Sequence, residues 1–132
     1  MMRAVFFLTL FVSLSFNNIV FAADAKVGEK VFRRCMACHF ADKEQHKIGP
    51  SLKNIIGRRA GTAPGYTYSA AMVNAGKQGL IWNKENLEKY LHSPRQFING
   101  TKMFGVNLKS DTDIDDLIEY LESFSDKEDV KK

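Results

Sequence analysis

Cys35-Met36-Ala37-Cys38-His39 (CMACH) is the stretch that decides the fold, because it places two thiols and an imidazole close together in the chain. The pattern C-x-x-C-H is the attachment sequence for a c-type haem. Two thiols three positions apart near the end of a helix can each add across a haem vinyl group, and the adjacent imidazole can then face the iron. The motif predicts one covalent haem c on Cys35 and Cys38, with His39 as an iron ligand.

Three other uses of paired cysteines compete with haem attachment. A thioredoxin-like redox pair needs a β-α-β context, and the sequence indicates no run of strands. Half of a zinc site needs a second pair of ligands, and His46 and His92 are isolated in the sequence. A disulfide is the default in an exported chain, but the histidine directly after the second cysteine favours haem.

The start of the chain has the order of a secretory signal peptide. Arg3 supplies an early positive charge, residues 4–16 form an apolar run, and small residues follow at Ala22, Ala23 and Ala25. The alternative is a retained membrane anchor, but the apolar run ends short of the about 20 residues that a span needs. We therefore expect a signal peptide at residues 1–22, cleaved somewhere in 22–25, and one domain at 23–132 that ends in a short polar tail.

An electron carrier wants a sixth iron ligand, so that no coordination position stays open to chemistry. Outside the expected leader and the motif, the sequence offers Met72 and Met103. Met103 lies in a glycine-bracketed loop at residues 99–105, which can curl a side chain inward. Met72 lies in an alanine-rich helical turn, where a core role is more natural. The residues alone favour Met103 and leave Met72 as the alternative.

The charges of the chain are unevenly distributed. The formal net charge is +4, and removal of the leader, whose one charged residue is Arg3, lowers it to +3. No basic arm or interleaving of basic and aromatic residues suggests nucleic-acid binding. Basic residues crowd the first half of the chain and acidic residues its end, and a molecule with a positive and a negative side can orient an incoming partner. The basic residues of the first half are Arg33, Arg34, Lys43, Lys47, Lys53, Arg58 and Arg59, and the acidic ones near the end are Asp111, Asp113, Asp115, Asp116, Glu119 and Glu122.

Apolar periodicity predicts an all-α fold with long loops. Gly28 is costly inside a helix, which makes sense if the last helix crosses closely there. The loop at residues 40–67 is long for a segment without secondary structure, and a haem would supply the core that it wraps. The expected helices cover Ala25 to about Arg34, Ser69 to Ala75, Lys84 to His92 with Asn83 as its cap, and Asp113 to Ser125 with Thr112 or Asp111 as its cap.

Several further motifs resemble class I c-type cytochromes, in the branch of short soluble bacterial forms close to mitochondrial cytochrome c. The resemblance implies the cytochrome c fold, in which three main helices, short helices and long loops wrap one covalent haem. The motifs are GEKVFRRCMACH at 28–39, HKIGPSL at 46–52, IIGRRAGTAPGYTYSAAM at 55–72, GLIW at 79–82, NLEKYLHSP at 86–94 and GTKM at 100–103.

The resemblance also implies roles for individual residues. Met103 becomes the axial methionine, and Pro50 offers its carbonyl oxygen to the outer ring nitrogen of His39. Tyr90 matches a tyrosine whose hydroxyl lies near the methionine sulfur, and Thr101 matches a hydroxyl on the propionate side. Without the resemblance, the sequence favours ordinary core packing as the role of Tyr90 and Trp82. The residues that match the surroundings of the haem propionates are Arg58, Tyr66, Tyr68 and Trp82.

By the same resemblance, the chain is a soluble monohaem electron carrier, not an enzyme, that shuttles single electrons at an exposed haem edge. The donor is a quinol-oxidising cytochrome complex and the acceptor a terminal oxidase of a respiratory chain or a photosynthetic reaction centre. The leader implies the bacterial periplasm, and the carrier is expected to be a monomer. Arg95 and Gln96 replace a lysine pair beside the haem edge, which thins the basic ring of the family.

Two rival functions remain open on the sequence. A haem enzyme could release Met103 and open its iron to peroxide or gas. A non-haem module could join Cys35 and Cys38 in a disulfide and bind a partner.

Overall fold

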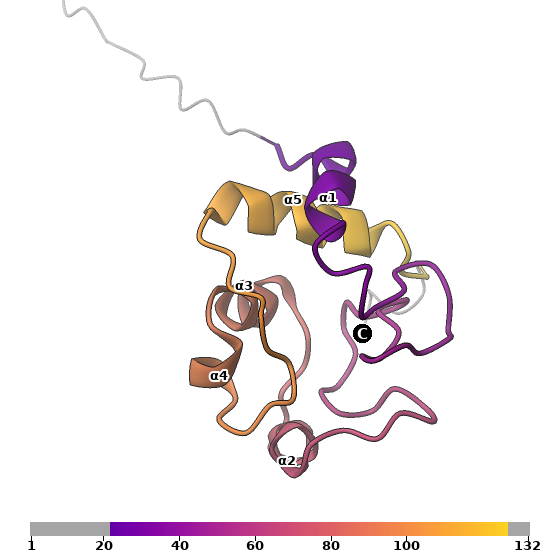
Figure 1. Ribbon diagram of the computed structural model, residues 1–132, viewed down its shortest axis with the longest axis vertical. Helices are drawn as coiled ribbons and strands as arrows, with labels where there is room; N and C mark the ends of the chain where they lie inside the picture. The colour runs from indigo at the N-terminus through magenta and orange to yellow at the C-terminus, as the bar shows by residue number, and fades with distance from the viewer. Residues whose placement is uncertain (1–21, 127–132) are drawn as a thin grey trace, which may run out of the picture.

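Two helices that are far apart in the sequence, α1 (Ala25–Phe32) and α5 (Asp111–Glu122), cross one another at one end of the molecule (Figure 1). The computed structural model describes residues 22–126. The expected signal peptide therefore lies outside the described residues except for Ala22, and so does the polar tail after Asp126.

The crossing of α1 and α5 depends on Gly28. A Cβ atom at this position would lie 1.9 Å from the backbone oxygen of Asp116 and 2.8 Å from Cβ of Tyr120, so only a hydrogen atom fits. The buried carboxylate of Asp116 also accepts the backbone N–H of Asp24 at 2.7 Å. The close helix crossing that the sequence predicted at Gly28 is confirmed.

The two ends of this helix pair differ from the sequence prediction. Helix α5 begins at Asp111, two residues earlier than expected, because Ser110 accepts the backbone N–H of Asp113 at 3.1 Å and is the cap in place of Thr112 or Asp111. It ends at Glu122 instead of Ser125. Helix α1 ends at Phe32 instead of Arg34, and the chain continues in turns of mixed hydrogen bonding. The N–H groups of Arg34, Cys35 and Cys38 donate to the carbonyl three residues back, as in a tighter helix, whereas those of Met36 and His39 donate to the carbonyl four residues back.

The remaining helices lie below α5 in the view of Figure 1, α3 and α4 at the left and α2 at the bottom. The predicted third helix is confirmed as α3 with its Asn83 cap. The predicted short helix is α2, in which Ser69 is the cap and the last residue is Lys77, two residues later than expected. Helix α4 was not predicted. Its first residue is Pro94, which is suited to a first helical position but also ends α3. The bounds are Ala70–Lys77 for α2, Lys84–His92 for α3 and Pro94–Phe97 for α4.

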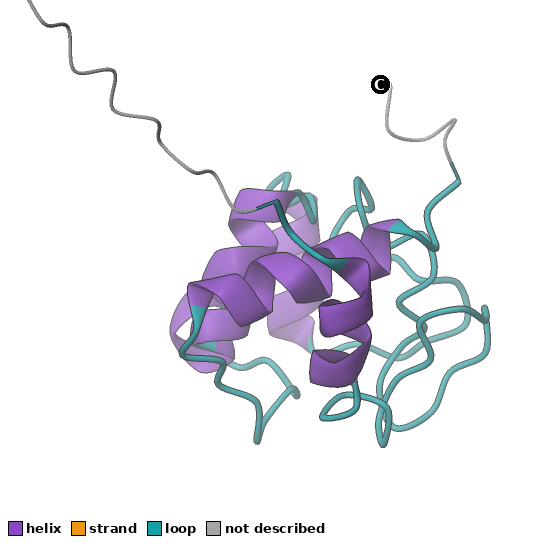
Figure 2. Ribbon diagram, turned by 90° about the horizontal axis from the view of Figure 1, so that it is seen from above, coloured by secondary structure: helices purple, strands orange, loops and turns teal. Residues whose placement is uncertain are grey.

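Between α1 and α2 the chain forms turns and loops, which gather at one side of the molecule (Figure 2). Backbone hydrogen bonds fix this segment at intervals, as where the N–H of Leu52 donates to the carbonyl of Phe40 at 2.8 Å. Residues 22–126 contain no β-strand, and Arg59 and Ile81 form an isolated antiparallel bridge. Among the helices of this part of the chain, none is long and apolar enough to cross a membrane.

Candidate functional site

The CMACH motif occupies the turns that extend α1. The N–H groups of Cys38 and His39 both donate to the carbonyl of Cys35, at 3.0 Å, which brings the three residues into one helical turn. Both thiols are free; Cys35 is buried and Cys38 is half-buried. Burial raises the pKa of the Cys35 thiol, against the opposing effect of Arg34, so this group is held in its neutral form.

The imidazole of His39 is fixed by the backbone on two sides. Its Nδ1 atom donates to the carbonyl oxygen of Pro50 at 2.7 Å. Because a carbonyl can only accept, Nδ1 carries the proton and Nε2 keeps the lone pair that a metal needs. Burial lowers the pKa of His39, which also favours the neutral ligand form. The hydrogen bond implied between Pro50 and His39 is therefore present.

Gly49 holds the same ring from its face, and the sequence reasoning missed this role. A Cβ atom on Gly49 would lie 2.3 Å from Cε1 of His39. The ring therefore packs directly against backbone that no other residue can supply without displacing it. The glycine before Pro50 in IGP was the available signal, but sequence alone does not reveal which ring it contacts.

Met103 and three neighbours form a second, connected group. The N–H of Met103 donates to Oγ1 of Thr101 at 3.3 Å, and Thr101 Oγ1 lies 2.7 Å from the buried hydroxyl of Tyr90. The rings of Tyr90 and Trp82 pack with centroids 4.9 Å apart. Met103 is half-buried against the core, whereas Met72 is buried within it on α2. The structure thus brings Trp82, Tyr90, Thr101 and Met103 together.

Arg58 and two tyrosines form a third group. The guanidinium donates to the carbonyls of Lys53 and Ser51, at 3.1 and 2.9 Å. Its Nε atom is buried and has no hydrogen-bond partner. Burial lowers the pKa of Arg58, an effect opposed by nearby Tyr68. Tyr68 accepts the N–H of Ala63 at 3.3 Å and keeps its own hydroxyl proton available.

Tyr66 differs from Tyr68 in that its hydroxyl proton already has an acceptor. Its ring packs edge-on against Tyr68 at 4.8 Å, but its hydroxyl donates to the carbonyl of Ile48 at 2.7 Å. A phenol has one proton to donate. In this arrangement Tyr66 therefore ties two loops together. Arg58 keeps an N–H, and Tyr68 an O–H, that can still donate to another acceptor.

The donor set of these groups fits a haem. A buried N–H without an acceptor costs about 1–3 kcal/mol, so the orphaned Nε of Arg58 requires an acceptor that the described residues do not supply. A haem propionate is such an acceptor, and Nε2 of His39 presents a free lone pair on a ring already fixed by Pro50. The two free thiols lie one and four residues before that histidine in the chain.

His46 is a further residue whose role the sequence reasoning missed. In the sequence it is isolated from other possible zinc ligands, but in the structure it connects two loops. Its Nε2 donates to the carbonyl of Pro64 at 2.8 Å, and its Nδ1 accepts the N–H of Ser51 at 3.0 Å. Among residues 22–126, no three His, Cys, Asp or Glu side chains gather in a way that could hold a metal ion.

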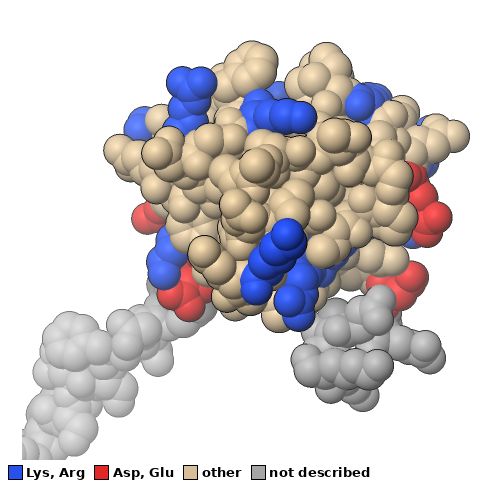
Figure 3. All heavy atoms as spheres, turned by 90° about the horizontal axis from the view of Figure 1, so that it is seen from below, with Lys and Arg blue, Asp and Glu red and all other residues tan. Residues whose placement is uncertain are grey.

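Basic and acidic side chains gather on different parts of the described surface. Lys43 and Lys47 lie over the ring of Phe40, at 5.1 and 4.1 Å from its centroid, close to the CMACH turn. The face seen from below carries lysine and arginine side chains, while acidic side chains lie at its margins (Figure 3). Helix α5 carries the acidic cluster at the opposite end of the molecule (Figure 1).

Comparison with known proteins agrees with this site. Residues 25–125 match the family described as cytochrome c. Cytochrome c2 of Afifella marina is 42% identical over 98 residues, which are 74% of this chain and 79% of that protein. Cytochrome c 2.1 of Caenorhabditis elegans is 44% identical over 107 residues, covering 80% and 94% of the two chains.

A solved structure shows the same fold. Cytochrome c2 from Rhodospirillum centenum superposes with a TM-score of 0.71 and 38% sequence identity, over 79% of this chain and all of that one. The cytochrome c fold predicted from the motifs is thereby confirmed. The free thiols, the neutral imidazole beside them and the orphaned guanidinium N–H are what a covalent haem c requires, and this chain belongs to the cytochrome c family.

Proposed function

We propose that this chain is a monohaem electron carrier, with haem c joined to Cys35 and Cys38 and the iron bound by His39 and Met103. The observation that carries the proposal is the hydrogen bond from Nδ1 of His39 to Pro50, at 2.7 Å, beside two free thiols. When bound, the six-coordinate haem iron supplies a one-electron couple. With His39 and Met103 as ligands no iron position would stay open to a substrate, so we propose a carrier and not an enzyme.

The residues around the iron keep its coordination constant. Pro50 and Gly49 hold the His39 ring in one orientation, and the hydrogen bond to Pro50 makes His39 a stronger donor. Thr101 and Tyr90 brace the loop that carries Met103. A thioether ligand favours ferrous iron. Together these features support a positive reduction potential with little rearrangement on electron transfer.

Arg58, Tyr68, Trp82 and Thr101 are proposed to surround the propionates. A buried carboxylate is costly unless donors meet it. Arg58 offers its unpartnered Nε and Tyr68 its hydroxyl proton. Tyr66 supports this side by holding the loop at Ile48 in place.

The surface supports brief docking to redox complexes. Met36, Ile48 and Phe104 are large apolar residues that are 51%, 76% and 77% exposed, and they belong to the CMACH turn, the loop before Pro50 and the Met103 loop. Basic side chains lie nearby on Lys43 and Lys47. Apolar contact with complementary charge gives fast, salt-sensitive association. We propose a quinol-oxidising cytochrome complex as donor and a terminal oxidase or photosynthetic reaction centre as acceptor.

The leader implies work in the bacterial periplasm, after export and cleavage between residues 22 and 25. The similarity to bacterial cytochromes c2, such as that of Afifella marina, supports this location. The mature protein is proposed to act as a monomer.

The deciding experiment is a redox titration and absorption spectrum of the matured protein and of Met103→Ala. The variant is expected to lose the far-red sulfur-ligation band and to fall sharply in potential. Met72→Ala is the matched control, because it truncates a buried methionine of the same core. Loss of the band in Met72→Ala instead would reassign the axial ligand, and a colourless matured protein would end the proposal.

The enzymatic alternative is tested on the same preparation. A carrier whose Met103 stays bound is expected to take up carbon monoxide poorly in the reduced state. Ready binding of carbon monoxide by the unmodified protein would favour peroxide or gas chemistry at an open iron.

A further inference from the structure

The orientation of Arg58 is set by the backbone of residues 51–53. Two of its nitrogens donate to the carbonyls of Ser51 and Lys53, at 2.9 and 3.1 Å. None of the ion pairs within residues 22–126 includes Arg58. With two sides of the planar guanidinium fixed, the direction of the remaining buried N–H, at Nε, is fixed too. Movement of the two carbonyls would therefore turn this N–H away.

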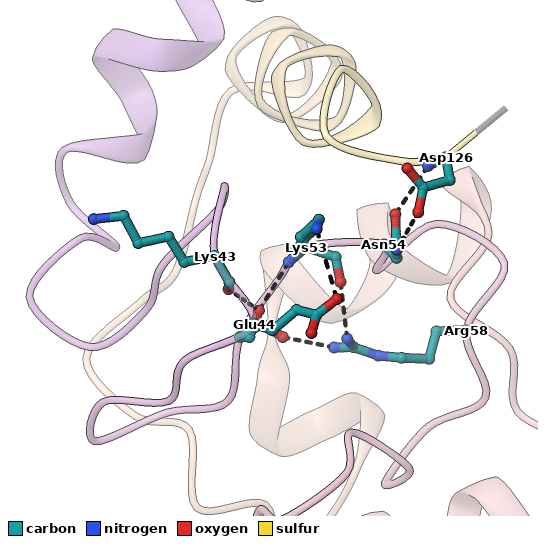
Figure 4. Close-up of polar contacts among 7 residues, drawn as sticks. Lys43, Glu44, Lys53, Asn54, Arg58 and Asp126 are labelled. Carbon is teal, nitrogen blue, oxygen red and sulfur yellow. Dashed lines mark hydrogen bonds and ion pairs between the residues drawn. The ribbon is translucent and has the colours of Figure 1, made fainter.

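The segment that carries these carbonyls is anchored at both ends. At its start, the hydroxyl of Ser51 donates to the carbonyl of Lys43 and accepts the N–H of Lys53 at 3.2 Å. The ion pair of Lys53 with Glu44, at 3.6 Å, is exposed on the Glu44 side and adds little. At its far end stands Asn54 (Figure 4).

Asn54 is joined to the segment after α5 by three hydrogen bonds, which we call the Asn54–Asp126 clasp. The side-chain amide donates to the carboxylate of Asp126 at 2.9 Å, and its oxygen accepts the Asp126 N–H at 2.9 Å. The backbone N–H of Asn54 donates to the carbonyl of Phe124 at 3.3 Å. Asn54 has φ of 57°, the left-handed region that asparagine enters more readily than most residues.

We propose that the Asn54–Asp126 clasp is a positioning device for Arg58, through which the segment after α5 tunes the reduction potential. The inference rests on the proposed function, because it takes the buried N–H of Arg58 to face a haem propionate. A guanidinium held against a propionate offsets its negative charge, and electron addition to the iron becomes more favourable. Loosening the clasp frees the carbonyls of Ser51 and Lys53, and the potential falls.

The test is Asn54→Gly in the haem-loaded full-length protein. Glycine keeps the left-handed backbone, removes both side-chain hydrogen bonds and changes no charge. We expect the equilibrium constant for reduction to fall about threefold, or ~28 mV at 59 mV per tenfold for one electron. Ser110→Ala is the matched control, because it is also neutral and weakens the other end of α5 by removing its cap. Its potential is expected to stay unchanged.

A second background shows whether the effect passes through Arg58. In Arg58→Gln the potential is expected to fall, and adding Asn54→Gly is expected to lower it no further. Faster hydrogen exchange at the Asp126 amide in Asn54→Gly reports the opened clasp independently of the haem. If Asn54→Gly does not mature, Asp126→Ala replaces it as the test. Loss of the negative charge of Asp126 would by itself raise the reduction potential, whereas an opened clasp lowers it, so a fall in potential reports the clasp.

Two results would overturn the inference, and they differ from failure of the proposed function. An unchanged potential in Asn54→Gly despite faster exchange at Asp126 would show that the clasp does not act on Arg58. An equal fall in the Arg58→Gln background would show that it acts by another route. If Arg58→Gln alone leaves the potential unchanged, the propionate role of Arg58 is wrong, and the proposed carrier function still stands on His39 and Met103.

Discussion

The hydroxyl oxygen of Tyr90 lies 2.7 Å from Oγ1 of Thr101, and the pair is buried between α3 and the loop that carries Met103. The same Thr101 oxygen accepts the N–H of Met103. Tyr90 of α3 thus supports the backbone of Met103, the proposed axial ligand, through the hydroxyl of Thr101. Burial raises the pKa of Tyr90, so the phenol stays protonated and can share this bond.

We expect Tyr90→Phe to lower the free energy of unfolding by about 0.5–1.5 kcal/mol, the net contribution of one hydrogen bond. The far-red band of methionine ligation should also weaken at a lower temperature than in the parent protein. Denaturant unfolding and thermal scans of this band measure the two effects. Tyr120→Phe, which removes the hydroxyl of a half-buried tyrosine on α5, is the control. If the far-red band of Tyr90→Phe persists to the same temperature as in the parent protein, Thr101 holds Met103 without help from Tyr90.

Gly28→Ala tests the helix crossing. The added Cβ would lie 1.9 Å from the Asp116 backbone oxygen, so α1 and α5 must separate. Overpacking of this kind costs about 1–3 kcal/mol or more. Glu29→Ala, an exposed change on the same helix, should stay within about 0.5 kcal/mol of the parent protein. Equal unfolding free energies for the two variants would contradict the tight crossing.

Gly49→Ala tests the contact with the proximal ring. A methyl group 2.3 Å from Cε1 of His39 forces the imidazole to tilt or its loop to move. We expect lower stability and a shifted reduction potential, measured by denaturant unfolding and redox titration. Ile48→Ala, which truncates a side chain that is 76% exposed next to Gly49, should change neither property. An unaltered potential in Gly49→Ala would mean that Pro50 alone orients the ring.

How much of this the sequence predicts depends on the range of the interaction. Local signals identified α3 with its Asn83 cap, and the CMACH spacing predicts where haem would attach. The crossing at Gly28 was also predicted, because a glycine inside a helix needs a packing reason. Helix ends were less accurate: Ser110 was overlooked as a cap beside Asp111 and Thr112, which are equally plausible.

Contacts between distant residues could not be predicted in this way. Asn54 and Asp126 are 72 residues apart, and neither lies in a recognisable pattern. The same holds for His46 and Pro64, whose contact depends on how two loops fold over one another. The orphaned N–H of Arg58 becomes visible only when every neighbouring acceptor has been placed. Sequence motifs therefore indicate the chemistry of the site, and the tertiary structure shows what holds it in position.

The burial of His39 predicts how stability depends on pH. Its pKa in the folded protein lies below the unfolded value of about 6.5, and an iron bound at Nε2 would exclude a second proton as well. The unfolded chain, with His39 released, therefore binds more protons in this region. The stabilisation is fully present above that value and is lost as the pH falls below it. We expect the free energy of unfolding to decrease from about pH 7 to pH 5. His92→Gln, which removes a surface histidine that contacts Asp111, should leave most of this slope. A flat profile would contradict a buried, neutral His39.

The hydrogen bond between Asp24 and Asp116 bears on where the proposed leader would be cut. Two sites suit a signal peptidase, one after Ala22 and one after Ala25. Cleavage after Ala25 would remove Asp24, whose side chain caps α1 by accepting the N–H of Lys26 at 2.8 Å. The buried carboxylate of Asp116 would lose the donor that now lies 2.7 Å away.

These two losses make the earlier cut the better one for the folded protein. A missing helix cap costs about 0.5–2 kcal/mol, and a buried acceptor without a partner costs about 1–3 kcal/mol more. We therefore expect the intact mass of the exported protein to correspond to a chain that begins at Ala23. Asp24→Ala should lower the unfolding free energy by the cost of the cap alone, because its backbone N–H still reaches Asp116. The opposite result would be a mature protein that begins at Lys26 and is as stable as a recombinant chain that begins at Ala23. It would show that neither contact matters, because the helix crossing at Gly28 would then hold α1 against α5 without them.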